Sequence, residues 1–534
     1  MKTFGVMLDM SRNGVMKPEQ VKKFAKVIST FGYNMIQLYT EDTYEVDNEP
    51  YFGYMRGRYT KAELKDIVHY CNSIGVEVVP CIQTLAHLNQ IFRWDTYKEI
   101  NDFGDILLVG KERTYSLIEN MFKTLRECYT TNKIHIGMDE AHMLGLGKYL
   151  DENGYRNRFD ILFEHLKKVI AIAEKYNFKP MMWSDMFFRL ANNGEYYPQH
   201  KYISKEVKEK TPRDIGLVYW DYYHTEKNHY AKMLKAHKQF DNEIWFAGGA
   251  WSWGGFASKN DYSLATMKPA MSACRDVKIE NVLITMWGDN GKECSFYSLL
   301  PSLYAIRCFY DGNTDMRKIK TDFKILTGES FDEIRALDLP NIIGTEKKAT
   351  RRTICKDALY NDPFLGVLDT TIQEGWAHIY KRYAKRLSRY AKKSQYGYIF
   401  ECMAQLCKTL SLKFDLGLRT RRLYKEKDIE SLNKLIADYK KTERELKAFI
   451  KTFKKLWFEE NKPNGFEVQE QRLGGLLLRL QSCRERLREF VNGEIQTIPE
   501  LEEELLDFYG NEKTFMVKNI YYNKWDKTVS PNCI

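Results

Sequence analysis

The chain has 534 residues, of which 44% are hydrophobic, 14% aromatic and 29% charged, and its formal net charge is +10. This length and composition are typical of a soluble globular protein with two or three domains, each large enough to bury a core without disulfides or a metal ion. No apolar run approaches the length of a membrane span, which argues against a membrane protein.

The amino-terminal stretch MKTFGVMLDMSRNG has one lysine and a short apolar run that is interrupted by Asp9 and Arg12. It lacks the apolar core and the cleavage site of a secretory signal, so we expect a cytoplasmic protein. The 11 cysteines are scattered and never form a C-x-x-C pair. We therefore expect reduced, mostly buried thiols, and neither a metal site nor another cofactor.

Short apolar runs alternate with amphipathic, helix-length stretches from residue 4 to about residue 310. This alternation predicts strands joined by helices, as in a parallel sheet. The eight predicted strands are residues 4–10, 35–39, 77–82, 134–138, 180–183, 216–220, 244–249 and 281–287.

Helix boundary signals support these elements. Pro18 begins the first helical stretch and Gly32 ends it, while Thr60 and Glu63 form a capping box before the second. Eight units of about 35 residues fit a (β/α)8 TIM barrel better than an open sheet. An open doubly wound sheet would carry a glycine-rich phosphate loop after its first strand, and LDMSRNGVM is not one. The predicted fold class is therefore α/β, with a TIM barrel at its centre.

Beyond about residue 335 the sequence changes to long stretches rich in Lys, Glu, Leu and Arg, at residues 372–395, 398–424, 428–461 and 466–492. They predict an all-α helical domain after the barrel, with domains at 1–335 and 336–534. The sequence leaves open whether this domain closes a cleft or forms a homodimer. One helical face of KRYAKRLSRYAKK, residues 381–393, is basic; we interpret it as a solvated face and expect no nucleic-acid partner, although a polyanion site is the alternative.

In such a barrel the functional residues lie at the carboxyl ends of the strands. The residues that follow the predicted strands are carboxylates, an arginine, a histidine and aromatic rings: Asp9, Arg12, Glu41, Asp42, His87, Asp139, Glu140, Trp183, Asp185, Trp220, Asp221, Tyr222, Trp251, Trp253, Trp287, Asp289 and Glu293. Tryptophan rings stack on the C–H faces of a pyranose, and carboxylates and arginine bind its hydroxyls. This rim therefore predicts a sugar pocket.

The stretch KIHIGMDEAH, residues 133–142, ends an apolar run on the adjacent acids Asp139 and Glu140. Two unpaired charges would be costly there, so a functional role is favoured. Crowding also splits the titration of two acids, so that one holds a proton near neutral pH while its neighbour stays ionised. Acid-assisted cleavage of a glycoside needs such a pair.

Five stretches occur in order along the barrel sequence: YTEDTYEV from 39, PCIQTLAHL from 80, HIGMDE from 135, YWDYY from 219 and MWGDNGKECS from 286. HIGMDE resembles the H-x-G-G-D-E motif of glycoside hydrolase family 20, the β-N-acetylhexosaminidases, with Met138 in place of the second glycine. The other four stretches are similar to the hexosaminidase D-like branch of that family.

This resemblance implies an exo-acting, retaining enzyme that releases terminal β-linked GlcNAc or GalNAc from an oligosaccharide or glycoconjugate without a cofactor. The substrate's own 2-acetamido oxygen attacks and forms an oxazolinium intermediate. Glu140 would be the general acid and base, Asp139 would orient the acetamido group, and Tyr222 would cap its oxygen. The implied substrate-binding residues are Arg12, Asp42, His87, Trp183, Trp220, Trp251, Trp253, Trp287, Asp289 and Glu293.

Two alternatives remain open. AWSWG, residues 250–254, differs by one residue from the G-x-S-x-G nucleophile elbow, so Ser252 is the candidate nucleophile of a serine hydrolase. Ala250 replaces the tight-turn glycine, however, and two tryptophans flank the hydroxyl. The second alternative is a sugar-binding protein without catalysis, against which the retained Asp139 and Glu140 argue. Met138 narrows the space beside these acids.

Overall fold

The computed structural model describes residues 3–191, 195–197, 203, 205–343, 349–508 and 510. The chain forms two compact units. We name Met1–Ala250, Ser263–Trp287 and Ser302–Asp322 the barrel unit, and Trp251–Tyr262, Gly288–Pro301 and Phe323–Ile534 the helical unit.

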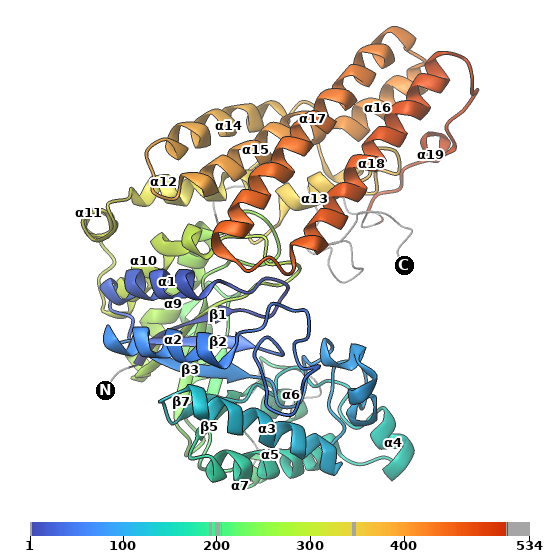
Figure 1. Cartoon of the computed structure of the whole chain (residues 1–534). Helices are drawn as coiled ribbons and strands as arrows, with labels where there is room; N and C mark the ends of the chain where they lie inside the picture. Colours follow the sequence, from blue (N-terminus) through green and yellow to red (C-terminus); the bar gives the residue numbers. More distant parts are fainter. Residues whose placement is uncertain are drawn as a thin grey trace. The chain divides into compact units, whose positions relative to one another are not determined.

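Eight parallel strands form a closed barrel, in which β1 pairs with both β2 and β8 (Figure 1). This confirms the predicted fold class. The strands are β1 (Thr3–Asp9), β2 (Met35–Thr40), β3 (Glu77–Ile82), β4 (Lys133–His135), β5 (Lys179–Trp183), β6 (Gly216–Trp220), β7 (Ile244–Gly249) and β8 (Asn281–Met286). All residues of β2 and β7 are buried, because the side chains on one face fill the barrel and those on the other lie under helices.

Helices alternate with these strands, and the two that follow the signals at Pro18 and Thr60 begin where the sequence predicted. The alternating helices are α1 (Pro18–Thr30), α2 (Lys61–Ser73), α3 (Glu112–Cys128), α4 (Lys148–Asn153), α5 (Arg158–Lys175), α6 (Asp185–Ala191), α7 (Lys205–Lys210), α8 (Lys227–His237), α9 (Asn260–Val277), α10 (Leu300–Tyr310) and α11 (Met316–Thr327). Pro18 is the first residue of α1, and Thr60 and Glu63 form the predicted capping box of α2. Short 3₁₀ turns lie at Ile91–Arg93, Asp95–Ile100 and Phe296–Leu299.

The helical unit contains long helices that lie side by side, among them α17 and α18 (Figure 1). Its helices are α12 (Phe331–Arg335), α13 (Ile354–Tyr360), α14 (His378–Ala391), α15 (Gly397–Lys413), α16 (Leu416–Glu426), α17 (Ile429–Glu460), α18 (Phe466–Val491) and α19 (Pro499–Glu502), with 3₁₀ turns at Ala336–Asn341 and Asp369–Thr371. The predicted stretch 398–424 forms two helices, because Asp415 leaves the helical path and accepts a hydrogen bond from the backbone of Gly375.

The predicted basic face of residues 381–393 belongs to α14 and is exposed, while Tyr380, Ala384 and Leu387 are buried on the opposite face. The cysteines in the described part of the chain are ten unpaired thiols, and all of them except Cys308 are buried. Among the described residues, every helix is too short or too polar to cross a lipid bilayer.

Candidate active site

The backbone turns sharply after β4, where the predicted acid pair lies. Gly137, Met138 and Glu140 have positive φ angles of 72°, 67° and 52°, so β4 is shorter than the predicted strand 134–138. A Cβ atom on Gly137 would lie 2.0 Å from Oε1 of Gln83, which explains the glycine. Met138 adopts the same left-handed conformation with a side chain, at a cost on the order of 1–3 kcal/mol.

Asp139 is a buried carboxylate with two partners. Gln83 donates from Nε2 to Oδ1 of Asp139 at 2.8 Å, and Nε2 of His87 lies 3.2 Å from Oδ2. Burial acts to raise the pKa of Asp139, but His87, Gln83 and Arg12 together lower it to about 2. Burial acts to lower the pKa of His87, but the charge of Asp139 outweighs it and the pKa rises to about 10. Asp139 is therefore ionised, and His87 protonated, throughout the neutral range.

Glu140 has a more open environment than its neighbour. Its side chain is 43% exposed, and its Oε2 lies 3.8 Å from Nε2 of His87. Its backbone N–H donates to Oδ2 of Asp185 at 3.2 Å. Of the two adjacent acids, one is thus buried and held in place, and the other is accessible to a ligand.

Asp185, the first residue of α6, is a third carboxylate in this cluster, and no role was predicted for it. Its Oδ2 also lies 3.3 Å from Nε of Arg189, while its Oδ1 is buried without a hydrogen-bond partner among the described residues. Burial, together with the charges of Asp139 and Glu140, raises the pKa of Asp185 to about 7. Asp185 therefore releases its proton within the neutral range.

The wild type should lose stability as the pH rises, because the buried carboxyl group of Asp185 must then ionise. We expect the variant Asp185→Asn, whose amide cannot ionise, to lose less stability. The pKa of Asp185 is about 7 in the folded state against an ordinary 3.8, so its protonated form stabilises the fold below about pH 4. This contribution is lost as the pH rises through 7. Between pH 5 and pH 8 the free energy of unfolding of the wild type should fall on the order of 2 kcal/mol more than that of the variant.

Urea unfolding at both pH values measures this difference. Asp241→Asn is the matched control, because the side chain of Asp241 is 79% exposed and its replacement should leave the pH dependence unchanged. Identical pH dependence in the wild type and Asp185→Asn would contradict the assignment.

Arg12 lies among acids and aromatic rings after β1. Its Nη1 is 3.3 Å from Oδ2 of Asp9, its Nη2 is 3.6 Å from Oε1 of Glu41, and its guanidinium lies 4.7 Å from the ring centre of Trp287. The side chain is 20% exposed. The guanidinium is thus oriented by ion pairs and a cation–π contact.

A chain of hydrogen bonds connects this cluster with the acid pair. Tyr39 donates from its hydroxyl to Oε1 of Glu41 at 3.0 Å, and Nε2 of Gln83 donates to the same hydroxyl at 3.0 Å as well as to Asp139. Residues on β2 and after β3 and β4 therefore form one network. The edge of the Tyr39 ring packs against Trp287 at 4.9 Å between ring centres.

Aromatic side chains from β5, β6 and the end of β8 lie in the same region. Trp183 lies 6.0 Å from Trp287 between ring centres, and the hydroxyl of Tyr222 is hydrogen-bonded to the side chains of Trp287 and Thr285. Trp220 stacks on Tyr222 with ring centres 5.5 Å apart and planes inclined by 19°. The indole N–H of Trp183 is buried and has no hydrogen-bond partner among the described residues.

The structure therefore brings one group of the predicted residues together in the barrel unit: Arg12, His87, Asp139, Glu140, Trp183, Tyr222 and Trp287. Trp220 borders this group through Tyr222. Asp42 also lies in the barrel unit, but its buried carboxylate is paired with Arg56 at 3.2 Å.

The remaining predicted residues belong to the helical unit: Trp251, Trp253, Asp289 and Glu293, together with the alternative nucleophile Ser252. Trp251 and Trp253 stack with ring centres 4.1 Å apart, and Ser252 between them in sequence is 3% exposed. The carboxylate of Glu293 is buried and lies 2.7 Å from Nζ of Lys356 and 3.4 Å from Nη1 of Arg472. Glu293 thus has two cationic partners within its own unit.

Two residues of the network, Tyr39 and Gln83, were not among the predicted strand-end residues, and two others, Glu41 and Asp185, were predicted at the strand ends without a specific role. Gln83 directly follows β3 and lies within the PCIQTLAHL motif, so a systematic reading of the first residue after each strand would have found it. The signal for Tyr39 is weaker, because a buried tyrosine within a strand is usually part of the core.

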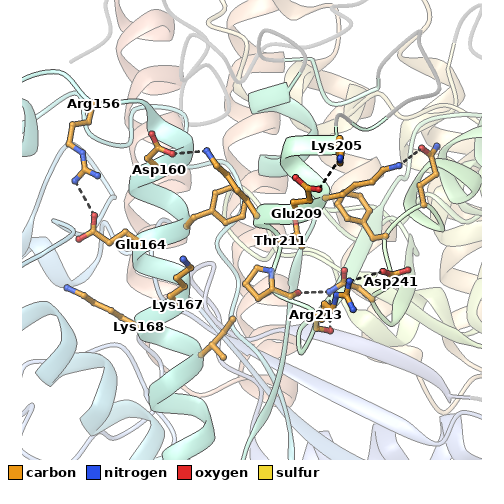
Figure 2. Close-up of a pocket in the computed structure, with 18 residues that line it drawn as sticks. Arg156, Asp160, Glu164, Lys167, Lys168, Lys205, Glu209, Thr211, Arg213 and Asp241 are labelled. Carbon is orange, nitrogen blue, oxygen red and sulfur yellow. Dashed lines mark hydrogen bonds and ion pairs between the residues drawn. The ribbon is translucent and has the colours of Figure 1, made fainter.

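A separate hollow of about 1110 Å³ lies between α5, α7 and the segment after α8 (Figure 2). Its charged residues pair with one another, as in Arg156 with Glu164 and Arg213 with Asp241. None of the predicted site residues lines it. Since the hollow contains none of the candidate catalytic residues, we locate the chemistry at the strand ends instead.

Comparison with known proteins identifies the family of the chain. The model of the glycosyl hydrolase family 20 catalytic domain matches residues 4–238, and that of the glycoside hydrolase 20C C-terminal domain matches residues 329–519. Hexosaminidase D of Bos taurus is 24% identical over 223 residues, which cover 38% of this chain and 60% of that protein. Hexosaminidase D of Homo sapiens is 23% identical over 223 residues, covering 38% and 42%.

The chain thus spans less than two thirds of the length of these relatives. A solved structure of the family 20 exo-β-N-acetylglucosaminidase of Vibrio harveyi aligns with a TM-score of 0.48 at 12% identity, covering 63% of this chain and 58% of that one. The catalytic-domain and C-terminal-domain models match in this order along the sequence. The chain therefore belongs to glycoside hydrolase family 20.

Proposed function

We propose that the protein is an exo-acting β-N-acetylhexosaminidase that releases terminal β-linked GlcNAc or GalNAc with retention of configuration. The observation that carries this proposal is the contrast between Asp139 and Glu140. One acid is buried and ionised beside His87 and Gln83, and its neighbour is 43% exposed. Membership of family 20 supports hydrolysis of an N-acetylhexosaminide.

Asp139 acts on the acetamido group of the substrate. Its carboxylate accepts a hydrogen bond from the acetamido N–H and orients the group, so that the carbonyl oxygen attacks the anomeric carbon. An oxazolinium ion forms as the glycosidic bond breaks, and the negative charge of Asp139 stabilises it. A pKa of about 2 keeps this charge in place at any working pH. The hydroxyl of Tyr222 donates to the acetamido oxygen.

Glu140 moves the protons of both steps. In its acid form it protonates the glycosidic oxygen as the aglycone leaves. The resulting carboxylate then takes a proton from the water molecule that opens the oxazolinium ion, which restores the acid and gives the retained product. Its exposed side chain can reach both the leaving group and the water.

The surrounding side chains bind the sugar ring. Arg12 holds hydroxyl groups, and the faces of Trp183, Trp220 and Trp287 contact the ring. Further residues proposed to contact the substrate are Asp42, His87, Trp251, Trp253, Asp289 and Glu293. Replacing Asp42 or Glu293 should affect KM less than replacing Arg12, because both carboxylates are buried whereas the side chain of Arg12 is 20% exposed.

The proposed substrate is an oligosaccharide or glycoconjugate with a terminal N-acetylhexosamine, cleaved in the cytoplasm without a cofactor in the chemical steps. The proposed domain boundary lies between residues 335 and 336. Light scattering in solution tests for a homodimer.

Hydrolysis of p-nitrophenyl glycosides tests the proposed function. We expect release of p-nitrophenol from β-GlcNAc or β-GalNAc derivatives and far slower release from the β-glucoside, which lacks the acetamido nucleophile. Similar rates on all three would contradict substrate-assisted catalysis. Tight binding of a thiazoline analogue without any turnover would instead favour the inactive sugar-binding alternative. Ester hydrolysis that Ser252→Ala abolishes would favour the serine hydrolase.

Gln83 is proposed as a positioning residue, and Gln83→Met tests it. Methionine keeps the approximate volume but removes the hydrogen bonds that Gln83 donates to Asp139 and Tyr39 and the one that it accepts from the backbone N–H of Met138. We expect kcat to fall roughly 10-fold, the equivalent of one lost hydrogen bond, with little change in KM. Gln496→Met, at an exposed position, is the control. An unchanged kcat, or equal changes in kcat for both variants, would contradict the role.

A further inference from the structure

Three polar side chains without a role in the proposed reaction lie close together after β6. Nδ1 of His224 is 2.8 Å from Oδ2 of Asp221, and Nε2 of His229 is 3.2 Å from the same oxygen. The potential ligand atoms of all three lie within 4.8 Å of one another. Asp221 is the first residue after β6 and His229 the third residue of α8, so the cluster connects a strand end to the first turn of the following helix.

The carboxylate of Asp221 is fixed and ionised. It is fully buried, and it accepts hydrogen bonds from the hydroxyl of Tyr219 at 2.8 Å and from the backbone N–H of Tyr223 at 3.0 Å. Burial acts to raise the pKa of Asp221, but the hydrogen bonds from His224 and His229 outweigh it and lower the pKa to about 2. Outer hydrogen bonds of this kind orient the carboxylate ligands of metal sites.

The two imidazoles form a parallel stack beside this carboxylate, with ring centres 3.5 Å apart and planes inclined by 12°. Nε2 of His229 is buried and faces Oδ2 of Asp221 at 3.2 Å. The hydroxyl of Tyr197, whose ring packs edge-on against both imidazoles, is also buried without a hydrogen-bond partner among the described residues.

We propose that Asp221, His224 and His229 bind one divalent transition-metal ion, with zinc as the best fit. Two imidazole nitrogens and a carboxylate oxygen form a donor set that zinc uses in proteins. A tetrahedral zinc ion with bonds of about 2.0–2.1 Å separates its ligand atoms by about 3.3 Å. The separations of 2.8 and 3.2 Å between Asp221 and the two histidines are already close to this value. The two imidazole rings must tilt out of their stack, however, so that both nitrogens point at one ion. The imidazole side chains are 34% and 23% exposed, so the ion and a water molecule as fourth ligand can enter from solvent.

The bound ion would brace the segment that carries Tyr222. In extended chain, neighbouring side chains point to opposite sides, and Asp221 faces Tyr219 while Tyr222 faces Thr285 and Trp287. Fixing Asp221 to α8 therefore fixes Tyr222 at the rim of the site. This consequence rests on the proposed function, whereas binding of the ion does not.

This inference revises the expectation, drawn from the sequence, that the chain holds no metal. The spacing D-x2-H-x4-H matched none of the patterns considered, and only the turn from strand to helix brings the three residues together. The ion would be structural, and the proposed chemistry at Asp139 and Glu140 still needs no metal.

Metal titration of the whole chain, purified without a histidine tag and stripped with a chelator, tests the proposal. We expect calorimetry to show one zinc ion bound per chain with micromolar or lower Kd. The double variant His224→Gln/His229→Gln should weaken binding at least 100-fold, while His69→Gln, at an exposed histidine, should leave it unchanged. Zinc binding that is absent, or equally strong in the double variant, would overturn the proposal.

If the double variant fails to fold, binding of Co²⁺ to the wild-type chain provides a second test. Addition of Co²⁺ to the wild-type chain should produce visible absorption bands of a nitrogen- and oxygen-ligated ion, saturating at one equivalent and abolished by zinc. A spectrum that remains that of aqueous cobalt would overturn the proposal. Activity gives a separate readout: the stripped enzyme should show a raised KM for the β-GlcNAc substrate that zinc reverses. If neither form turns over, the proposed function fails while the binding result stands.

Discussion

Replacing Glu140 with glutamine is expected to lower kcat by roughly 10²–10⁴-fold on a substrate whose aglycone is a poor leaving group, such as a second sugar. The amide cannot protonate the glycosidic oxygen, so that oxygen must leave as an alkoxide. A phenolate leaves without help, so the loss should be much smaller on a nitrophenyl glycoside. The dependence of the effect on the leaving group separates loss of the acid from a general disturbance of the site.

Two features make this comparison specific for the loss of the acid. Glutamine preserves the size of the side chain, which is 43% exposed, and the backbone N–H that donates to Asp185 is unaffected. Glu99→Gln, which changes an exposed glutamate elsewhere in the barrel unit, is the matched control and should retain wild-type rates on both substrates. Full activity of Glu140→Gln on the disaccharide would show that another group supplies the proton.

The sequence was sufficient to predict the barrel, because its strands and helices carry local signals. Periodic apolar runs, Pro18 at the start of α1 and the capping box of Thr60 and Glu63 all act within a few residues of chain. Two departures arose from long-range contacts. The strand containing Met138 ends early because its backbone turns against Gln83, and Asp415 divides a predicted helix by binding the backbone of Gly375.

In the candidate site, too, local sequence signals were predictive and long-range contacts were not. Asp139 and Glu140 are recognisable because adjacent charges end an apolar run. The opposite environments of these two acids come from Gln83, His87 and Asp185, which lie after other strands. The sequence predicted that one acid would hold its proton near neutral pH. In the structure the acid whose pKa rises to about 7 is Asp185, which the sequence argument placed at the rim without a specific role.

Met138 has a backbone conformation that usually requires glycine. The φ angle of 67° at this position suits glycine, the residue of the family motif, and a methionine there is strained. The side chain is fully buried, so burial of its apolar surface, about 2 kcal/mol for a methionine, offsets much of that strain. Met138 therefore fills the interior next to the acids.

Replacing Asp139 with asparagine should lower kcat/KM by roughly 10²–10³-fold, the loss expected when one preorganised electrostatic partner of the transition state is removed. The amide lacks the charge that stabilises the oxazolinium ion. The thiazoline analogue, which carries the same ring, should bind more weakly by a similar factor. Loss of activity on the N-acetyl substrates with unchanged binding of the thiazoline would contradict the role given to Asp139.

The same variant should change the titration of His87, which gives a readout independent of turnover. The charge of Asp139 is what raises the pKa of His87 to about 10, against the lowering effect of burial. Without that charge the pKa of His87 should fall by several units, so the ring becomes neutral at pH 8. The imidazolium of His87 stabilises the folded wild type at pH values below its ordinary pKa of 6.5, and this contribution is lost only as the pH rises through 10. Histidine resonances followed by NMR between pH 5 and 10 measure the shift, and a His87 that still titrates near 10 in Asp139→Asn would show that the ion pair does not control it.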